Sequence, residues 1–472
     1  MDTHETYEKP RKGAHVLVFP YPLQGHINPM LQFSKRLASK GLKITIITTT
    51  TIPNHISSSQ SQSNPSSLDF LRIFDGYEGE PDKRNFDEYI NLLKVSTSRS
   101  LHELLEYYNQ NKMDIYPGPN MVIYDSFMPW VLQVVKNCGF QGAPFFTQSC
   151  LVNSIYYYAY KGDLISPFCG SDLVSLPSVG SLLRVHDLPT FVSYPTLYPE
   201  KLVKLLLDQF SNLEDVSFVF INTVDVLESK VLECMARLWP VKTIGPCIPS
   251  MYLDKCLQDD KDYGLSLLEP QIDVCIKWLN TRETCSVVYV SMGSLASLGS
   301  EQMKQIANAL VKSKKYFLWV VRPSEENKLP LNFKENTSKR GLIVNWCPQL
   351  EVLSHIALAC FVTHCGWNSI LEAISLGVPI VGFPQWTDQP TNAKCIVEFW
   401  KIGVKVRVDE KGFLSSNELE FCIREVMEGE HAKEFKSNAN KWKLLTTHAM
   451  EQCGTSNRNI EEFASTLLSP SL

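Results

Sequence analysis

The chain has 472 residues, of which 45 are Lys or Arg and 50 are Asp or Glu, so its formal net charge is −5. With 44% hydrophobic and 20% charged residues it has the composition of an ordinary globular protein, and a typical domain size of about 150–200 residues predicts two or three domains. It contains no run of five or more like charges and no basic stripe, which argues against nucleic acid as a partner.

Residues 1–12 carry charges of both signs and no apolar segment, so no secretory signal peptide is expected. No stretch approaches the roughly 18 consecutive apolar residues that a membrane-spanning helix needs. The 14 cysteines are scattered without a C-x-x-C pair. This is typical of small buried side chains in a reducing compartment, and not of a disulfide framework or a zinc site. We therefore expect a cytoplasmic protein without a membrane span.

Short runs rich in Val, Ile and Phe, bounded by Gly or Pro, alternate along the chain with segments of helical period. Such runs are typical of buried parallel strands. The runs are long enough apart for crossover helices, so the sequence predicts an α/β fold with two units of parallel sheet. The expected strands cover residues 15–19, 43–48, 121–124 and 217–221 in the first half, and 286–290, 316–321, 342–346, 360–363 and 379–383 in the second.

A histidine lies in the segment after the first strand. An apolar helical period follows and stops at Gly41, and a proline is typical of the first turn of a helix, so a helix is predicted to begin near Pro29. This places His26 in a loop beyond the carboxyl end of a central strand, where open α/β sheets bind ligands. A histidine that only packs on the helix start is the alternative.

Asp125 directly follows the strand predicted over 121–124. Because parallel strands end at the same edge of a sheet, Asp125 and His26 should emerge at the same edge. A carboxylate beside an imidazole fixes its tautomer and stabilises the imidazolium, so the pair predicts a general base for a hydroxyl. Asp125 as the N-cap of a helix that starts near Ser126 is the alternative.

Two polar stretches interrupt the pattern. Residues 57–67 are mostly Ser, Gln and Asn, bury too little apolar area to offset their ordering entropy, and predict a mobile loop. Residues 244–273 are irregular and are interpreted as an interdomain linker. The D-x-D sequence of Asp260 and Asp262 could hold a divalent ion, but it lies in this linker and is expected to be a solvated surface run.

Several common catalytic motifs are missing. The sequence has no G-x-S-x-G, no G-x-G-x-x-G after the first strand and no G-x-x-x-x-G-K. These absences weigh against a serine hydrolase, hydride transfer and phosphoryl transfer.

A strand, a glycine turn and a helix follow one another in the second half. After the strand at 360–363 come His364, Gly366 and Asn368, and then an apolar helical period. The free amides and the positive dipole end of such a helix form a site for a pyrophosphate, with both polar side chains as donors. Ser294, in a Gly-Ser turn after another strand, could add a hydroxyl. A glycine that serves only helix–strand packing is the alternative for Gly366.

Further side chains around this turn suit a nucleotide-sugar. Trp346 is a flat ring able to stack on a base, Gln349 can read a base edge, and Glu372 could accept from ribose hydroxyls. Asp388 and Gln389 offer a carboxylate and an amide to sugar hydroxyls. Taken singly, each of these residues has a purely structural explanation: core packing, a solvated helix face or a helix cap. Together they would bind one nucleotide-sugar.

The residues from Trp346 to Gln389, read as WCPQ…FVTHCGWNSILEAISLGVPIVGFPQWTDQ, resemble the signature box of the plant UDP-dependent glycosyltransferases of secondary metabolism, with no departure within the box. The segments VFPYPLQGHINPMLQFSKRL, VIYDSFMPW and FFTQS fit the same family, so the resemblance covers nearly the whole chain. It is closest to the clade that acts on phenolic acids, steroids and triterpenoids.

The resemblance implies two Rossmann-like domains that face each other across a cleft, the GT-B architecture. The implied boundaries are an acceptor-binding domain over 1–245, a linker over 246–273, a UDP-sugar-binding domain over 274–455 and a helix over 456–472 that crosses back to the first domain.

The same resemblance implies the roles of individual residues. His26 matches the catalytic base and Asp125 its orienting acid; UDP-glucose is the implied co-substrate, with no metal and no other cofactor. A glutamine at position 389 usually goes with glucose. UDP-sugar contacts are implied for Ser294, Trp346, Cys347, Gln349, His364, Gly366, Trp367, Asn368, Ser369, Glu372, Trp386, Asp388 and Gln389, and acceptor contacts for Gln24, Phe127, Phe146, Gln148 and Tyr157.

The sequence therefore predicts a monomeric, inverting UDP-glucose-dependent O-glucosyltransferase. It would act on a hydroxyl or carboxyl of a small lipophilic plant metabolite and give a β-glucoside. A non-catalytic nucleotide-sugar or lipophile-binding protein on the same scaffold is the alternative. The aromatic residues of the first half suggest a bulky or flat acceptor, although core packing explains most of them equally well. The sequence leaves open the acceptor, the choice between ether and ester products, and the strictness for glucose.

Overall fold

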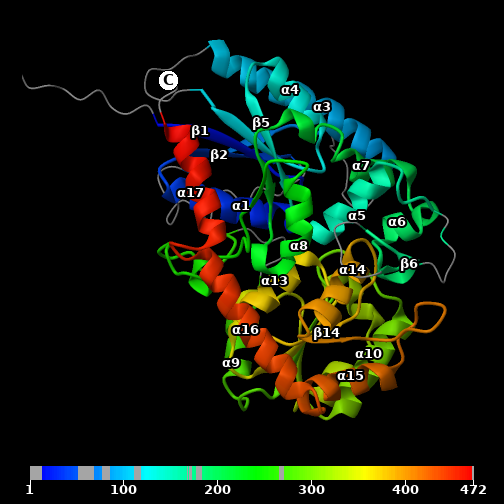
Figure 1. The fold of residues 1–472 in the computed structure, drawn as a ribbon. Helices are drawn as coiled ribbons and strands as arrows, with labels where there is room; N and C mark the ends of the chain where they lie inside the picture. The colour runs from blue at the N-terminus through cyan, green and yellow to red at the C-terminus, as the bar shows by residue number, and fades with distance from the viewer. Residues whose placement is uncertain are drawn as a thin grey trace, which may run out of the picture.

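The computed structural model describes residues 13–50, 68–76, 86–110, 118–166, 168, 173–176, 183–264 and 270–469. Figure 1 shows two α/β domains, one above the other, each built around its own sheet. The predicted mobile loop over 57–67 lies outside the described residues. The predicted α/β fold with two parallel sheets is confirmed.

The first sheet has seven parallel strands in the order β3-β2-β1-β4-β5-β8-β9. β1 lies in the interior, between β2 and β4, and Phe19 at its end is in register with Tyr124. The residues that follow β1 and β4 therefore emerge side by side. The strands are β1 (His15–Phe19), β2 (Lys43–Thr49), β3 (Leu68–Ile73), β4 (Met121–Asp125), β5 (Gln141–Phe146), β8 (Val219–Ile221) and β9 (Val241–Thr243).

Alternate residues of β1 face two different helical layers. Val16 and Val18 pack in the core that α1 and α5 cover, whereas Leu17 and Phe19 pack in the core that α3 and α4 cover. This two-sided burial explains the unbroken apolar run of the strand. The helices of this domain are α1 (Gln24–Ser39), α3 (Phe86–Gln110), α4 (Trp130–Asn137), α5 (Cys150–Tyr160), α6 (Thr190–Ser193), α7 (Glu200–Asp208) and α8 (Asp225–Ala236); β6 (Leu173–Val174) and β7 (Leu183–Arg184) form a small antiparallel pair.

The second sheet has six parallel strands in the order β12-β11-β10-β13-β14-β15. Ser291 at the end of β10 is in register with Thr363 at the end of β13, so the two turns that follow these strands also emerge together. The strands are β10 (Val287–Ser291), β11 (Tyr316–Val320), β12 (Gly341–Val344), β13 (Leu358–Thr363), β14 (Ile380–Gly382) and β15 (Gly403–Lys405).

The helices around the second sheet end in a long pair that returns to the first domain. The last helix packs Phe463 against Phe220, with ring centres 4.8 Å apart, and the hydroxyl of Ser456 donates to the carbonyl of Gly245 at 2.6 Å. Figure 1 shows this helix, in red, alongside the first domain. The helices are α9 (Ile272–Leu279), α10 (Ser300–Ser313), α11 (Phe333–Thr337), α12 (Gln349–Ser354), α13 (Trp367–Leu376), α14 (Gln389–Lys394), α15 (Ser416–Glu428), α16 (Ala432–Met450) and α17 (Thr455–Leu468).

The predicted start of the first helix near Pro29 is wrong. α1 begins at Gln24, so His26 lies in the first helical turn and not in a loop before it. An internal proline lacks the N–H that would bond the carbonyl four residues earlier, here that of Gly25. That carbonyl instead accepts a hydrogen bond of 2.6 Å from Asn368 Nδ2 of the second domain, which lets the helix continue through the proline.

The expectation of a solvated D-x-D run is also wrong in part. Asp260 is only 7% exposed, and its carboxylate accepts from the Ser250 N–H at 2.6 Å and from Lys35 Nζ at 2.8 Å. Asp262 is exposed and lines a cavity between the two sheets. The linker is therefore bonded to α1 and forms part of the wall of that cavity.

Among the described residues, none of the helices combines the length and the apolar character that a bilayer crossing requires.

Candidate active site between the two sheets

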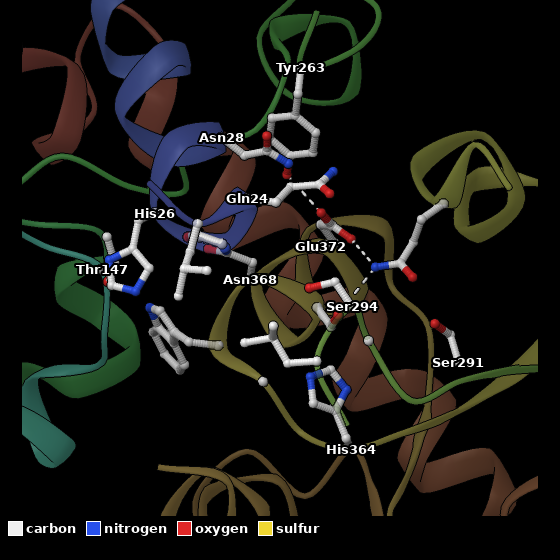
Figure 2. A pocket seen from close by; sticks show the side chains of 18 of the residues that line it. Gln24, His26, Asn28, Thr147, Tyr263, Ser291, Ser294, His364, Asn368 and Glu372 are labelled. Atoms are coloured by element: carbon white, nitrogen blue, oxygen red, sulfur yellow. Dashed lines mark hydrogen bonds between the residues drawn. The ribbon is translucent and has the colours of Figure 1, made fainter. Parts of the chain in front are cut away.

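A cavity of about 1220 Å³ opens between the carboxyl ends of the two sheets. The first domain contributes the start of α1 and the turns after β4 and β5, and the second contributes the turns after β10, β12, β13 and β14. Figure 2 shows His26 and Thr147 on one side and Ser294 and His364 on another. Every expected UDP-sugar contact lines this cavity: Ser294, Trp346, Cys347, Gln349, His364, Gly366, Trp367, Asn368, Ser369, Glu372, Trp386, Asp388 and Gln389.

His26 and Asp125 form a close pair at the wall of the first domain. His26 Nδ1 lies 2.7 Å from Asp125 Oδ2, and the Asp125 side chain is fully buried. The other carboxylate oxygen accepts from the Phe127 N–H at 3.0 Å. With Nδ1 engaged, Nε2 is the imidazole nitrogen left for a ligand in the cavity that His26 lines. Asp125 does not cap α4, whose N-cap is Pro129.

His364 lies against two glycines on the opposite wall. A Cβ added to Gly293 would come within 2.7 Å of the His364 ring, and one added to Gly366 within 2.5 Å of its Nε2. Both glycines therefore leave room for the imidazole, which is a reason for Gly366 beyond helix packing. Burial lowers the pKa of His364 to about 4, partly offset by a hydrogen bond to the backbone at Ser291. A neutral ring at pH 7 can still donate one N–H to an anion.

The helix start beside His364 is the expected anion site. Gly366 is the N-cap of α13, so the first amides of this helix face the cavity without helical partners. The two neighbouring polar side chains reach across to the first domain: Asn368 Nδ2 bonds the Gly25 carbonyl, and Trp367 Nε1 donates to the Asn222 carbonyl at 2.7 Å. The indole of Trp367 thus holds the domains together, and its backbone is the part suited to an anion.

A hydrogen-bonded cluster surrounds Glu372. Gln349 Nε2 donates to Glu372 Oε2 at 2.6 Å, and the Tyr263 hydroxyl donates to Glu372 Oε1 at 2.7 Å. Gln349 Oε1 accepts from the Tyr289 hydroxyl at 2.8 Å. Burial raises the pKa of Glu372, and these two donors counter the rise. A carboxylate offers about four acceptor positions, so ribose hydroxyls can share it with the protein donors.

The turn after β14 presents the expected sugar contacts. Asp388 Oδ2 accepts from Asn392 Nδ2 at 2.7 Å and Oδ1 accepts from the Thr387 hydroxyl at 2.6 Å; burial raises the pKa of this carboxyl. Gln389 Oε1 accepts from the Gln385 and Trp386 N–H groups at 2.8 and 3.1 Å. These bonds orient the Gln389 amide so that its nitrogen is the donor offered to a ligand.

Two of the expected acceptor contacts are not at the cavity. Phe146 is 1% exposed and packs on Phe210 at a ring distance of 5.6 Å. Tyr157 packs on Trp239 at 4.6 Å. Both side chains belong to the core packed around α5. The periodicity of the strand and the helix predicts that these residues are buried, but it does not predict whether other core residues or a ligand cover them. Gln24, Phe127 and Gln148 do line the cavity.

The structure adds residues that the sequence did not indicate. Thr147, Asn28 and Tyr263 line the cavity, and Figure 2 shows Asn28 and Gln24 near Tyr263 and Glu372. Nothing in the polar linker or in α1 distinguished these positions beforehand. The apolar wall is formed by Tyr21, Leu23, Phe86, Phe191, Leu202, Leu205 and Leu206, of which the last three lie on α7.

Within the described part of the chain, one group of possible metal ligands occurs away from the cavity. His102, Glu106 and Cys138 bring their ligand atoms within 4.8 Å of one another, between α3 and the end of α4. None of the three lines the cavity.

Two family models match this chain. The model described as "UDP-glucoronosyl and UDP-glucosyl transferase" matches residues 268–448, and that described as "Glycosyltransferase, N-terminal domain" matches residues 13–74. Mogroside I-E synthase of Siraitia grosvenorii is 46% identical over 96% of this chain and 98% of its own. The chain belongs to the plant family-one UDP-glycosyltransferases.

Solved structures support the assignment of this chain to the UDP-glycosyltransferases. Os79 from O. sativa in complex with UDP superposes with a TM-score of 0.87 at 36% identity, covering 96% of this chain and 100% of that one. Os79 in complex with U2F and trichothecene gives a TM-score of 0.85 at 37% identity, with the same coverage. The family, the GT-B fold and the class of enzyme predicted from the sequence are thereby confirmed.

Proposed function

We propose that this UDP-glycosyltransferase transfers glucose from UDP-glucose to a hydroxyl group of a small lipophilic metabolite, with inversion at the anomeric carbon. The observation that carries the proposal is the 2.7 Å contact between His26 Nδ1 and the buried carboxylate of Asp125, at the wall of a cavity shared with the signature segment. A general base in one domain thus faces a donor site in the other.

In the proposed reaction, His26 Nε2 takes the proton of the acceptor hydroxyl while its oxygen attacks the anomeric carbon from the face opposite UDP. The new C–O bond forms as the bond to the diphosphate oxygen breaks, so one displacement gives a β-glucoside. Asp125 stabilises the imidazolium, which later releases the proton to solvent.

The departing diphosphate would be stabilised by the second domain. The free amides at the start of α13, the N–H of a neutral His364 and the Ser294 hydroxyl converge where negative charge develops. Trp346 would stack on the uracil, and Glu372 would bind the ribose. Asp388 and Gln389 would hold the glucose. These groups require no metal ion for the displacement.

The acceptor side favours an apolar molecule. Aromatic and aliphatic side chains of the first domain form its wall, while the buried Oε1 of Gln148 has no hydrogen-bond partner among the described residues and could accept from a second polar group of the acceptor. The names of the similar proteins, a mogroside synthase and a trichothecene complex, support acceptors of this kind.

The test is incubation with UDP-glucose and a panel of phenols, steroids and triterpenoids, followed by mass spectrometry. The proposal predicts a mass gain of one hexose and, by proton NMR, a β-configured anomeric centre. An α-configured product would refute the inverting mechanism. Tight UDP-glucose binding with no product on any hydroxyl acceptor would favour the alternative, a non-catalytic binding protein.

A further inference from the structure

The turn expected to bind the sugar is held from the other domain. Thr190, the first residue of α6, donates its N–H to the Thr387 carbonyl at 2.9 Å, and its Oγ1 accepts from the Thr387 N–H at 2.9 Å. Figure 1 shows α6 and α14 at the junction of the two domains. Both polar backbone groups of Thr387 are therefore satisfied by one residue across the cleft.

Thr387 needs such support. Its φ of +56° lies in the left-handed region, which is unfavourable for a β-branched residue and persists only when neighbouring groups enforce it. In this conformation the Thr387 hydroxyl donates to Asp388 Oδ1 at 2.6 Å. The orientation of the Asp388 carboxylate thus depends on the backbone that Thr190 holds.

A second set of contacts supports the same junction. The Thr391 hydroxyl donates to the Asp187 carbonyl at 2.7 Å, and Lys394 Nζ lies 3.2 Å from the Asp187 carboxylate. Phe191 packs edge-to-face on Trp386, with ring centres 6.0 Å apart. The first domain therefore contacts the turn both before and after Thr387. Thr190 itself does not line the cavity.

We propose that Thr190 is a positioning residue for the sugar half of the donor. Through Thr387 it fixes the turn that presents Asp388 and Gln389 to the hexose, so a residue of the acceptor domain sets how well one UDP-sugar is distinguished from another. This inference rests on the proposed function, in which that turn binds glucose. The proposed uridine contacts around Trp346 lie outside these interdomain contacts and do not depend on them.

The test substitution is Thr190→Val, which keeps the branched shape and removes the oxygen that accepts from Thr387. Without this acceptor the half-buried Thr387 N–H loses its partner, and we expect the Kd of UDP-glucose to rise about 5–30-fold while the Kd of UDP changes less than about twofold. In turnover, the preference for UDP-glucose over UDP-galactose should fall. Thr190→Ser, which keeps the oxygen, should restore both values.

Thr196→Val is the matched control, because Thr196 is an exposed threonine a few residues further along the same segment. It should behave as the wild type. Thr391→Val, which removes the second anchor and leaves Thr190 in place, is the independent variant if Thr190→Val lowers the melting temperature too far to be measured. A selective loss of UDP-glucose affinity is expected there too.

Calorimetric Kd values for UDP-glucose and UDP decide the matter without turnover. The inference is overturned if the folded Thr190→Val protein, or Thr391→Val in its place, binds UDP-glucose as the wild type does, or loses UDP and UDP-glucose affinity equally. A wild-type protein that binds both ligands but transfers no sugar would refute the proposed function instead, and the selective loss of affinity would still be measured.

Discussion

His26 and His364 line two sides of the cavity. Each follows an interior parallel strand, β1 in the first sheet and β13 in the second. Their surroundings differ: His26 Nδ1 lies 2.7 Å from the buried Asp125 carboxylate, whereas His364 lies against Gly293 and Gly366. One imidazole thus has an anionic partner, and the other packs against two glycines.

The difference teaches what decides the role of a histidine at this edge of a sheet. A carboxylate at Nδ1 fixes the tautomer that leaves Nε2 free to accept a proton, and it stabilises the imidazolium formed during the reaction. Burial without such a partner favours the neutral ring, and it lowers the pKa of His364 to about 4. We therefore expect a base on the acceptor side and a neutral hydrogen-bond donor on the donor side.

The largest expected effect is that of His26→Ala. Removing the base should lower kcat on a hydroxyl acceptor by about 10²–10⁴-fold. The Kd of UDP-glucose should change little, because the proposed donor contacts lie on the second domain. Steady-state kinetics and calorimetry measure the two quantities, and full turnover by this variant would rule out the base.

Asp125→Asn should have the next largest effect. An amide that donates to His26 Nδ1 would force the ring proton onto Nε2, the nitrogen that must accept the acceptor proton. We expect kcat to fall about 10²–10³-fold at unchanged UDP-glucose affinity. The melting temperature serves as the control for folding, and a well-folded variant with wild-type kcat would contradict the role of the pair.

His364→Gln should affect the donor and spare the acceptor. Loss of one hydrogen bond to an anion corresponds to about 10–10²-fold in kcat/KM for UDP-glucose. The KM of the acceptor should stay within about twofold. His448→Gln, on the exposed surface of α16, is the control. A change confined to the KM of the acceptor would contradict the assignment of His364 to the donor side of the cavity.

The lowered pKa of His364 predicts a pH dependence of stability. With a pKa of about 4 in the folded chain and about 6.5 when unfolded, the neutral ring contributes stability above pH 6.5. This contribution is lost as pH falls from about 6.5 to about 4, because the unfolded chain binds the proton first, and it amounts to at most about 3 kcal/mol. Denaturant unfolding should show a smaller loss over this range in His364→Gln than in the wild type or His448→Gln.

Chelation should have the smallest effect. If the helix start and His364 stabilise the diphosphate, EDTA should change kcat by less than about twofold. A larger loss that Mg²⁺ or Mn²⁺ restores would show that a cation shares the donor side with His364.

Much of the site follows from strand ends alone. His364 and Ser294 line the cavity and Asp125 lies against His26, as predicted, because parallel strands end at one edge of a sheet and short apolar runs mark those ends. His26 lines the cavity although the helix start was misplaced. The Gly25 carbonyl, which Pro29 leaves without its helical donor, accepts instead from Asn368 of the other domain, and no local pattern indicates this contact.

What could not be predicted depends on how the domains meet. Tyr263 reaches Glu372 from a polar linker, and Thr190 bonds Thr387 across the cleft. Neither contact has a local sequence pattern, because both arise from long-range packing of separate units. The prediction that Phe146 and Tyr157 contact the acceptor did not hold for a related reason. Their apolar character indicates burial, and it does not say whether core residues or a ligand cover them.

The central claim is that His26 removes the acceptor proton. The most direct measurement is the ratio of wild-type to His26→Ala kcat across phenols of similar size whose hydroxyl pKa falls from about 10 to about 7. An acceptor that ionises by itself needs no base, so the ratio should shrink by at least about tenfold along the series. A ratio that stays constant, or that equals one throughout, would contradict the claim.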